Sequence, residues 1–212
     1  NASKFVFMHI EDYKPGKQEV KGFDLWLLSK MEKLVKSSTE SFEQYEYAQT
    51  KSEVEKFFWH VFCDNYLEIV KDRLYNPEVR GKEERKSAQT GLYIGILNTL
   101  KMMAPILPHI TEEVYQLWFA KIEKNKSVHL SSWPEPDLQY VNEDNEKVGD
   151  LLVEVIAKVR KAKTEKSLSM KAPVKELVLD LNEDDVKDFV EDLKAVTKAE
   201  RVSFAKKLAI KL

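Results

Sequence analysis

The sequence has one cysteine, few glycines and prolines, and no long apolar run. Cys63 is the only cysteine in 212 residues, which excludes an internal disulfide and a cysteine-based zinc site and suits a reducing compartment. Six glycines and seven prolines against 43% hydrophobic residues indicate a helical globular protein, not a disordered one. No segment approaches the roughly 18 apolar residues that span a bilayer. We expect a cytoplasmic protein without membrane contact, in which Cys63 is a small buried apolar group.

The sequence also lacks a strong charge of one sign. The formal net charge is −2, so any contact with a nucleic acid must come from a local basic patch and not from the overall field. The chain begins at Asn1 without an initiator methionine, and its first 13 residues mix apolar and polar side chains as if they continued a preceding element. We therefore expect a fragment of a longer protein.

Apolar residues at three- and four-residue steps predict three long helices. The first is capped by Asp24 and runs to about residue 47, the second covers about 51–75, and the third covers about 83–103. Ala88, Gly91 and Gly95 form a stripe of small residues on the third helix. Such a stripe lets a neighbouring helix approach closely, and the alternative is an approach of a ligand to the backbone.

Proline and threonine then predict a kinked helix pair. Pro105 and Pro108 end the third helix, and Thr111 is a suitable cap for the next one. An irregular stretch follows, in which Trp133 before Pro134 is expected to hold a loop against the bundle.

The last third of the chain has a different pattern. A helix is predicted over about 148–167, followed by a strand in "VKELVLDL", a helix in "DDVKDFVEDLKAVTK" and strands in "RVSF" and "KLAIKL". The predicted fold is mainly α, a helical bundle over 1–140 followed by a basic helix and a small α/β appendage over 141–212.

The sequence contains no motif of a known active site. It has no glycine-rich phosphate loop, no nucleophile elbow, and no pair of histidines at helical spacing for a metal. His60 and Asp64 lie one helical turn apart, which permits a shared proton or a metal ligand pair, although a surface hydrogen bond is the commoner reason for that spacing.

The second helix mixes aromatic and polar residues in "FFWHVFCDNYLEIVKDRLY". One apolar stripe accounts for core packing, whereas Trp59, Tyr66 and Leu67 project elsewhere, so the helix is expected to touch more than one neighbour. Trp59 is assigned mostly to the core. Lys71 and Arg73 are cations near the negative end of the helix dipole, so a purely structural role is open to them.

A basic segment, "KVRKAKTEK", lies near the end of the later helix. Its cations point almost all round the helix axis, which suits either a polyanion or the complementation of a helix C-terminus. The cations are Lys158, Arg160, Lys161, Lys163 and Lys166.

Several segments together resemble one family. "FFWHVFCDNYLEIVKDRLY" resembles the signature helix in the anticodon-binding domain of the class Ia aminoacyl-tRNA synthetases, and its Phe-Phe-Trp and Phe-Cys-Asp runs are similar to the valyl enzymes. The segments "DLWLLSKMEKLVKSSTESFEQYEY", "MMAPILPHITEEVYQLW" and "SVHLSSWPE" match the same domain in order. The likeness covers about residues 1–140 well and continues less specifically into the appendage. Asn65 departs from the valyl pattern, which often has Trp there.

The resemblance implies recognition of a valine tRNA, chiefly of its anticodon, by part of a valine–tRNA ligase that acts as a monomer. It assigns base or backbone contacts in the anticodon to Asp64, Asn65, Tyr66, Lys71 and Arg73, with Tyr66 stacking on a base. It assigns phosphates to Lys158, Arg160, Lys161, Lys163 and Lys166.

The resemblance also limits what this chain does alone. The HIGH and KMSKS motifs of the ATP site are missing, so no cofactor is expected here, whereas the full-length enzyme would use ATP and magnesium and would remove mischarged threonine. Three alternatives stay open: the corresponding domain of an isoleucyl or leucyl enzyme, a helical interaction module that binds no RNA, and a metal-dependent bundle enzyme.

Overall fold

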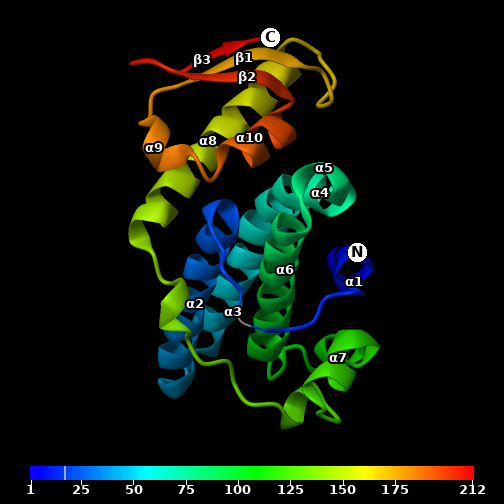
Figure 1. The fold of residues 1–212 in the computed structure, drawn as a ribbon. Coiled ribbons are helices and arrows are strands. Elements are labelled where there is room, and N and C mark those ends of the chain that lie inside the picture. The colour runs from blue at the N-terminus through cyan, green and yellow to red at the C-terminus, as the bar shows by residue number, and fades with distance from the viewer. Residues whose placement is uncertain (17) are drawn as a thin grey trace.

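The computed structural model describes residues 1–16 and 18–212, and it consists of a helical bundle with a small sheet at one end (Figure 1). The bundle elements are α1 Ala2–Ile10, α2 Gly22–Glu43, α3 Tyr47–Lys56, the π-helix η1 Phe57–Tyr66, α4 Leu67–Tyr75, α5 Pro77–Arg80, α6 Lys82–Met103 and α7 Pro108–Glu123. Figure 1 shows α2, α3 and α6 side by side, and contacts join these helices. The predicted mainly α class is confirmed.

The rest of the chain forms the appendage and its connection. Its elements are the 3-10 turns η2 Val128–Leu130 and η3 Leu138–Tyr140, helix α8 Glu143–Glu165, strand β1 Val174–Leu179, helices α9 Glu183–Val186 and α10 Val190–Thr197, and strands β2 Ala199–Phe204 and β3 Ala209–Lys211. The predicted order of helix, strand, helix and two strands is confirmed, although the second helix of this order is broken into α9 and α10.

The sheet has the order β2-β1-β3. Strand β1 pairs with β2 in parallel, with Val174 opposite Ala199, and with β3 in antiparallel, with Val178 opposite Ala209. A parallel pair needs a crossover connection, and α9 with α10 supplies it. Leu177 and Leu179 of β1 are fully buried in the shared core.

The second predicted helix differs from its expected form. It begins at Tyr47 and continues unbroken to Tyr75, but its middle third is the π-helix η1, and the Leu67 amide at its end donates to the Phe62 carbonyl five residues earlier. Five-residue bonding makes residues five apart neighbours on one face. This is the spacing of the buried residues Phe57, Phe62 and Leu67, and it explains why an α-helical period placed Leu67 away from the core.

The small-residue stripe on α6 packs against this π-helix, as predicted. A Cβ atom at Gly91 would lie 2.0 Å from the Tyr66 hydroxyl oxygen, and one at Gly95 would lie 2.7 Å from the Phe62 ring. Neither position has room for a side chain, so helix packing and not ligand approach explains both glycines.

Three local predictions have different outcomes. Trp133 holds its loop to the bundle, as expected: its indole nitrogen donates to the Thr39 hydroxyl at 2.9 Å. The Thr111 cap is wrong, because α7 begins at Pro108 and the Thr111 hydroxyl donates back to the Leu107 and Pro108 carbonyls. Cys63 is half-buried, not fully buried.

Helix α8 joins the bundle to the sheet. Its first half packs on α2, where a Cβ atom at Gly149 would lie 2.3 Å from the Trp26 ring and the Ser29 hydroxyl donates to the Glu146 carboxylate at 2.5 Å. Its second half lies against α10 (Figure 1). Because one helix packs on both parts, the division of the chain at residue 140 stays a prediction.

Candidate functional site

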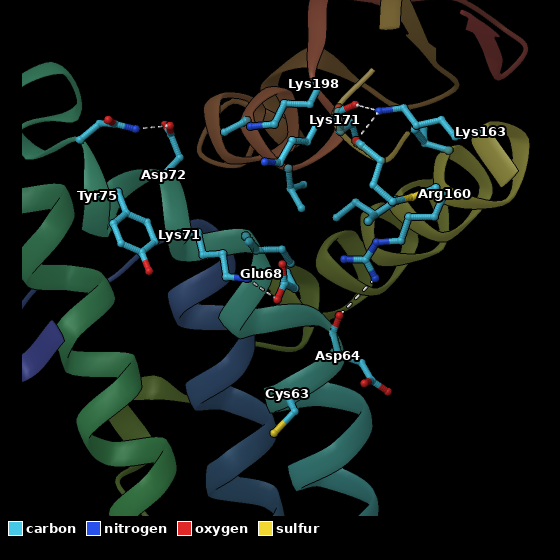
Figure 2. A pocket seen from close by; sticks show the side chains of 18 residues that line it. Cys63, Asp64, Glu68, Lys71, Asp72, Tyr75, Arg160, Lys163, Lys171 and Lys198 are labelled. Carbon is cyan, nitrogen blue, oxygen red and sulfur yellow. Dashed lines mark hydrogen bonds and ion pairs between the residues drawn. The ribbon is translucent and has the colours of Figure 1, made fainter. Parts of the chain in front are cut away.

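A pocket of about 640 Å³ lies where η1 and α4 meet α8 and α10. Figure 2 shows its labelled side chains: Glu68 and Lys71 project from α4, Arg160 and Lys163 from α8, and Lys198 from the end of α10. The predicted convergence of the second helix with the basic helix therefore exists in the fold.

The carboxylates on the α4 side of the pocket have partners. Glu68 accepts from the Lys71 ammonium at 2.5 Å, Asp72 accepts from Arg80 at 2.8 Å, and Asp64 lies 3.2 Å from the His60 ring nitrogen. The spacing of His60 and Asp64 thus produces an exposed hydrogen bond.

Within residues 1–16 and 18–212, the partners of Arg160 and Lys163 on the α8 side are backbone carbonyl groups. A guanidinium nitrogen of Arg160 donates to the Asp64 carbonyl at 3.1 Å. The Lys163 ammonium donates to the carbonyls of Met170 at 3.1 Å and Thr197 at 2.8 Å, and its side chain is fully buried. Burial lowers the pKa of Lys163, and the nearby Lys198 lowers it further. Because no carboxylate among the described residues pairs with Arg160 or Lys163, this side of the pocket is electropositive.

The structure corrects two of the predicted anticodon residues. Arg73 is only 2% exposed and forms two 2.7 Å hydrogen bonds to Asp24 of α2 and a 3.1 Å ion pair with Asp192 of α10. Tyr66 is fully buried, and its hydroxyl donates to Asp24 at 2.7 Å. A side chain without exposed surface has no face to offer a base, so both belong to the core.

We call this group of side chains the buried ionic cluster: Asp24, Tyr66, Arg73, Arg80, Ser87 and Asp192. It also corrects the expected role of Asp24, which lies inside α2 as an ion-pair partner and does not cap the helix. Burial raises the pKa of Asp192, with Arg73 and Arg80 opposing that rise. Burial likewise raises the pKa of Tyr66, and the Asp24 charge adds to the effect.

The other predicted anticodon residues remain accessible. Asp64 is exposed, Lys71 is half-buried, and both line the pocket. Asn65 is half-buried, and its side-chain nitrogen donates to the His60 carbonyl at 2.6 Å, which leaves the amide oxygen for other contacts.

The predicted phosphate residues separate into three groups. Arg160 lines the pocket, Lys158 and Lys161 are exposed on other faces of α8, and Lys166 is exposed directly after the helix ends. Lys163 is corrected: it is buried with both of its hydrogen bonds to carbonyl groups, so it is not a surface phosphate contact. Arg160 and the buried Lys163 are thus the two members of this set that line the pocket with Asp64 and Lys71.

Trp59 is the largest departure among the aromatic residues. The sequence assigned it to the core, but it is 57% exposed, and its ring lies 5.1 Å from that of Phe58. The π-helix accounts for this outcome, because its wider turn moves Trp59 off the buried face. An exposed indole is suited to stacking on a base.

Sequence reasoning missed Lys171 and Lys198, which both line the pocket. Lys198 follows α10 with the left-handed φ of 63° that ends a helix, and Lys171 lies in the short link between α8 and β1. Neither lies in a basic run, so only the tertiary fold brings them to Arg160.

Within residues 1–16 and 18–212, no group of three or more His, Cys, Asp and Glu side chains is arranged to hold a metal ion. Within the same residues, no helix has both the length and the apolar character needed to cross a membrane.

Comparison with known proteins gave concordant matches. Residues 24–179 match the family described as the anticodon-binding domain of tRNA ligase. The chain is 41% identical over 224 residues to a valine–tRNA ligase of Rickettsia rickettsii (strain Sheila Smith), covering 98% of this chain and 26% of that protein. It is 38% identical over 207 residues to a valine–tRNA ligase of Ehrlichia canis (strain Jake), covering 96% and 25%. The chain thus spans about a quarter of the length of these relatives.

Proposed function

The chain belongs to the family of anticodon-binding domains of tRNA ligases, and from this premise we propose that it binds the anticodon region of a valine tRNA. One observation carries the placement of that contact: accessible polar groups of η1 and α4 and cations of α8 and α10 line one pocket. Anticodon loops present unstacked bases, which proteins bind by stacking and by hydrogen bonds to base edges.

On the bundle side, the proposed contacts come from η1 and α4. Asp64 accepts hydrogen bonds, Lys71 donates them, and the amide oxygen of Asn65 accepts one. Trp59 is exposed on the same π-helix and supplies a ring for stacking. Together these groups provide both the edge contacts and the stacking surface that a loop needs.

On the α8 side, the proposed contacts are to phosphates. Arg160 projects into the pocket, whereas Lys158 and Lys161 on the exposed faces of the helix and Lys166 at its end lie outside it. Such contacts position an RNA and carry no base specificity. Each released counterion contributes about 0.7–0.9 to the slope of log affinity against log salt.

The longer protein is proposed to be a cytoplasmic, monomeric valine–tRNA ligase. Activation of valine with ATP and magnesium, transfer to tRNA and removal of threonine are proposed for regions outside this chain, because the HIGH and KMSKS motifs of the ATP site are missing from it. This chain then contributes recognition and not catalysis.

Fluorescence anisotropy with labelled tRNA transcripts tests the proposal. This chain is titrated with a valine tRNA and with a transcript that differs only in its anticodon, at several salt concentrations. We expect weaker binding of the altered transcript and loss of the preference in Lys71→Gln. Equal affinity for the two transcripts contradicts anticodon recognition.

The α8 lysines are tested in the same assay. The triple variant Lys158→Gln, Lys161→Gln, Lys166→Gln should lower the salt slope by about two units while leaving the preference between transcripts unchanged. The matched control is Lys187→Gln, because Lys187 is an exposed lysine of the appendage outside the pocket. An unchanged slope in the triple variant removes these residues from the tRNA surface.

A further inference from the structure

An exposed group of aromatic rings lies where α2 turns into α3, at the end of the bundle that points away from the sheet (Figure 1). Tyr45 and Tyr47 are 78% and 46% exposed, and their ring centroids lie 6.2 Å apart. The half-buried Phe42 ring continues the row, 5.0 Å from the ring of Tyr47 and 4.8 Å from that of Trp133. We call these four adjoining rings the aromatic patch.

The backbone of the turn makes tyrosine an unfavourable residue at position 45. The Glu46 amide donates to the Ser41 carbonyl at 2.8 Å, and the Tyr45 amide donates to the Phe42 carbonyl at 3.0 Å. This is the Schellman pattern of a helix end, in which the left-handed residue is usually glycine. Tyr45 has this conformation, with a φ of 63°, and a side chain there is strained. Because its ring lies mostly in solvent, packing offsets little of the strain.

Carboxylates accompany the aromatic patch. Residues 37–50 contain three glutamates and no lysine or arginine, and two of these glutamates, Glu43 and Glu46, belong to the turn. Glu135 follows Trp133 by two residues in the adjoining loop. All three carboxylates are exposed, and none is in an ion pair with another residue that the structure describes. The surface thus combines accessible rings with negative charge that has no counterion.

The charge of this surface is opposite to that of the proposed tRNA surface. Phe42 lies about 27 Å along α2 from Asp24 of the buried ionic cluster, at a rise of about 1.5 Å per residue. Carboxylates without counterions repel the phosphates of an RNA backbone. The aromatic patch is therefore no extension of the tRNA surface, and it fits a partner that carries positive charge.

Arginine is the cation that matches this surface best. Its guanidinium group is planar, stacks on aromatic rings and forms paired hydrogen bonds with a carboxylate. The lysine ammonium is compact and strongly hydrated, and it has no planar face to stack. Glu46 stands between Tyr45 and Tyr47 in the sequence, so a carboxylate and two exposed rings are adjacent along the chain.

We propose that the aromatic patch, together with Glu43, Glu46 and Glu135, binds an arginine-rich segment of a partner protein. Tyr45 and Tyr47 stack on its guanidinium groups, and the carboxylates pair with them. The patch and the pocket lie toward opposite ends of the bundle, so a protein and an RNA can occupy the chain together (Figure 1). The chain then has a protein-binding surface in addition to its tRNA surface.

Fluorescence anisotropy with labelled peptides tests the proposal in the absence of RNA. This chain is titrated at about 0.15 M salt into two fluorescein-labelled probes, a peptide of four Gly-Arg repeats and a peptide of four Gly-Lys repeats. The arginine peptide should bind with a Kd below about 1 mM and at least about fivefold more tightly than the lysine peptide. No saturation with the arginine peptide up to about 1 mM overturns the proposal, and so does equal affinity for the two peptides.

Tyr45→Gly separates binding from folding. Glycine removes the ring and also relieves the left-handed strain, so the unfolding temperature should be the same or higher. The arginine peptide should nevertheless bind at least about fivefold more weakly. A residue that only stabilised the turn would give the opposite result, a lower unfolding temperature with unchanged binding. Unchanged binding overturns the role of the aromatic patch.

A pair of charge variants separates specific contacts from general attraction. Glu46→Gln removes one charge of the turn and should weaken the arginine peptide at least about threefold. Asp184→Asn is the matched control, because Asp184 is an exposed carboxylate of the acid-rich helix α9, which has no aromatic residue. The control should leave the affinity unchanged. Equal weakening by the two variants overturns the site.

Binding of valine tRNA is measured separately with the same variants. Tyr45→Gly should keep the tRNA affinity of the wild-type chain, and a loss would place the aromatic patch on the RNA surface and overturn the proposal. If tRNA binds but the arginine peptide does not, the proposed function stands and the patch proposal fails. If the peptide binds but tRNA does not, the proposed function fails and the patch stands as a protein-binding surface.

Discussion

The buried ionic cluster lies next to a second group of cations, which line the pocket: Arg160, Lys163, Lys171 and Lys198. The two groups differ in the partners of their charges. Arg73 meets two buried carboxylates, those of Asp24 and Asp192, and these three residues are at most 5% exposed. A third carboxylate, that of the more exposed Glu84, lies 3.6 Å away. Lys163 is buried to the same degree, but its partners among the described residues are carbonyl groups. A neutralised charge joins helices α2, α4 and α10, whereas a charge without a counterion attracts one from outside.

The largest expected effect comes from removing the charge at the centre of the cluster. Arg73→Met leaves two buried carboxylates with a reduced counter-charge, and breaking a buried pair in this way costs about 3–5 kcal/mol. Urea unfolding of the variant and the wild-type chain measures this loss.

A surface pair of the same type is the control for Arg73. Arg85 donates to both carboxylate oxygens of Asp12, but the Asp12 side chain is 61% exposed. We expect Arg85→Met to cost about 1 kcal/mol or less. Equal losses in the two variants would show that burial does not distinguish the two pairs.

Glu32 is the acidic counterpart of Lys163, because it is a buried carboxyl group whose partner is a backbone group. It is 3% exposed and accepts from the Asp137 amide at 2.7 Å, and burial raises its pKa to about 7. Its contribution to stability is therefore fully present below pH 4.5 and is lost as the pH rises through about 7. At about 1.4 kcal/mol per pKa unit, the loss is about 3 kcal/mol.

Glu32→Gln tests this pH dependence, because an amide keeps the acceptor and cannot ionise. In urea unfolding, the free energy of unfolding of the variant should rise relative to that of the wild-type chain by about 2.5 kcal/mol between pH 5 and pH 8, because part of the loss has already occurred at pH 5. Glu40→Gln, a change at an exposed glutamate of the same helix, should show no such gain. A constant difference between Glu32→Gln and wild type at both pH values contradicts the assignment.

Gly91 tests how tightly the buried ionic cluster is packed. Gly91→Ala would place a Cβ atom 2.0 Å from the Tyr66 hydroxyl, which must then move from Asp24. We expect a cost of about 1–3 kcal/mol. In a double-mutant cycle with Tyr66→Phe, the two costs should sum to more than that of the double variant, since both act on one hydroxyl group. Additive costs would indicate that the glycine and the hydroxyl act independently.

The sequence predicted the arrangement of the elements better than the state of individual side chains. Helix lengths, the kink at Pro105 and Pro108 and the final α/β order follow from local patterns that the fold preserves. The π-helix does not follow from such a pattern, because Phe57, Phe58, Val61 and Phe62 also satisfy the three- and four-residue steps of an α-helix.

The site residues show the same limit more sharply. The sequence places Lys71 and Arg73 equally well near a helix end, but the partners of Arg73 lie 49 residues earlier and 119 later, at Asp24 and Asp192. Lys198 reaches the pocket only after the chain has formed α10. Burial and convergence depend on long-range contacts, which local periodicity does not report.

Lys71 gives the smallest expected change in stability. It lies two residues before Arg73 in α4, and its pair with Glu68 is 40% and 46% exposed. An exposed pair contributes about 0.2–1 kcal/mol to stability. The free energy of unfolding of Lys71→Gln, measured with urea, should therefore be close to that of the wild-type chain. Its tRNA affinity should fall nonetheless, because the lost charge faces the pocket. A loss of stability as large as that of Arg73→Met would show that Lys71 stabilises the fold as Arg73 does. It would contradict the distinction between the buried, paired charge of Arg73 and the accessible charge of Lys71 on this helix.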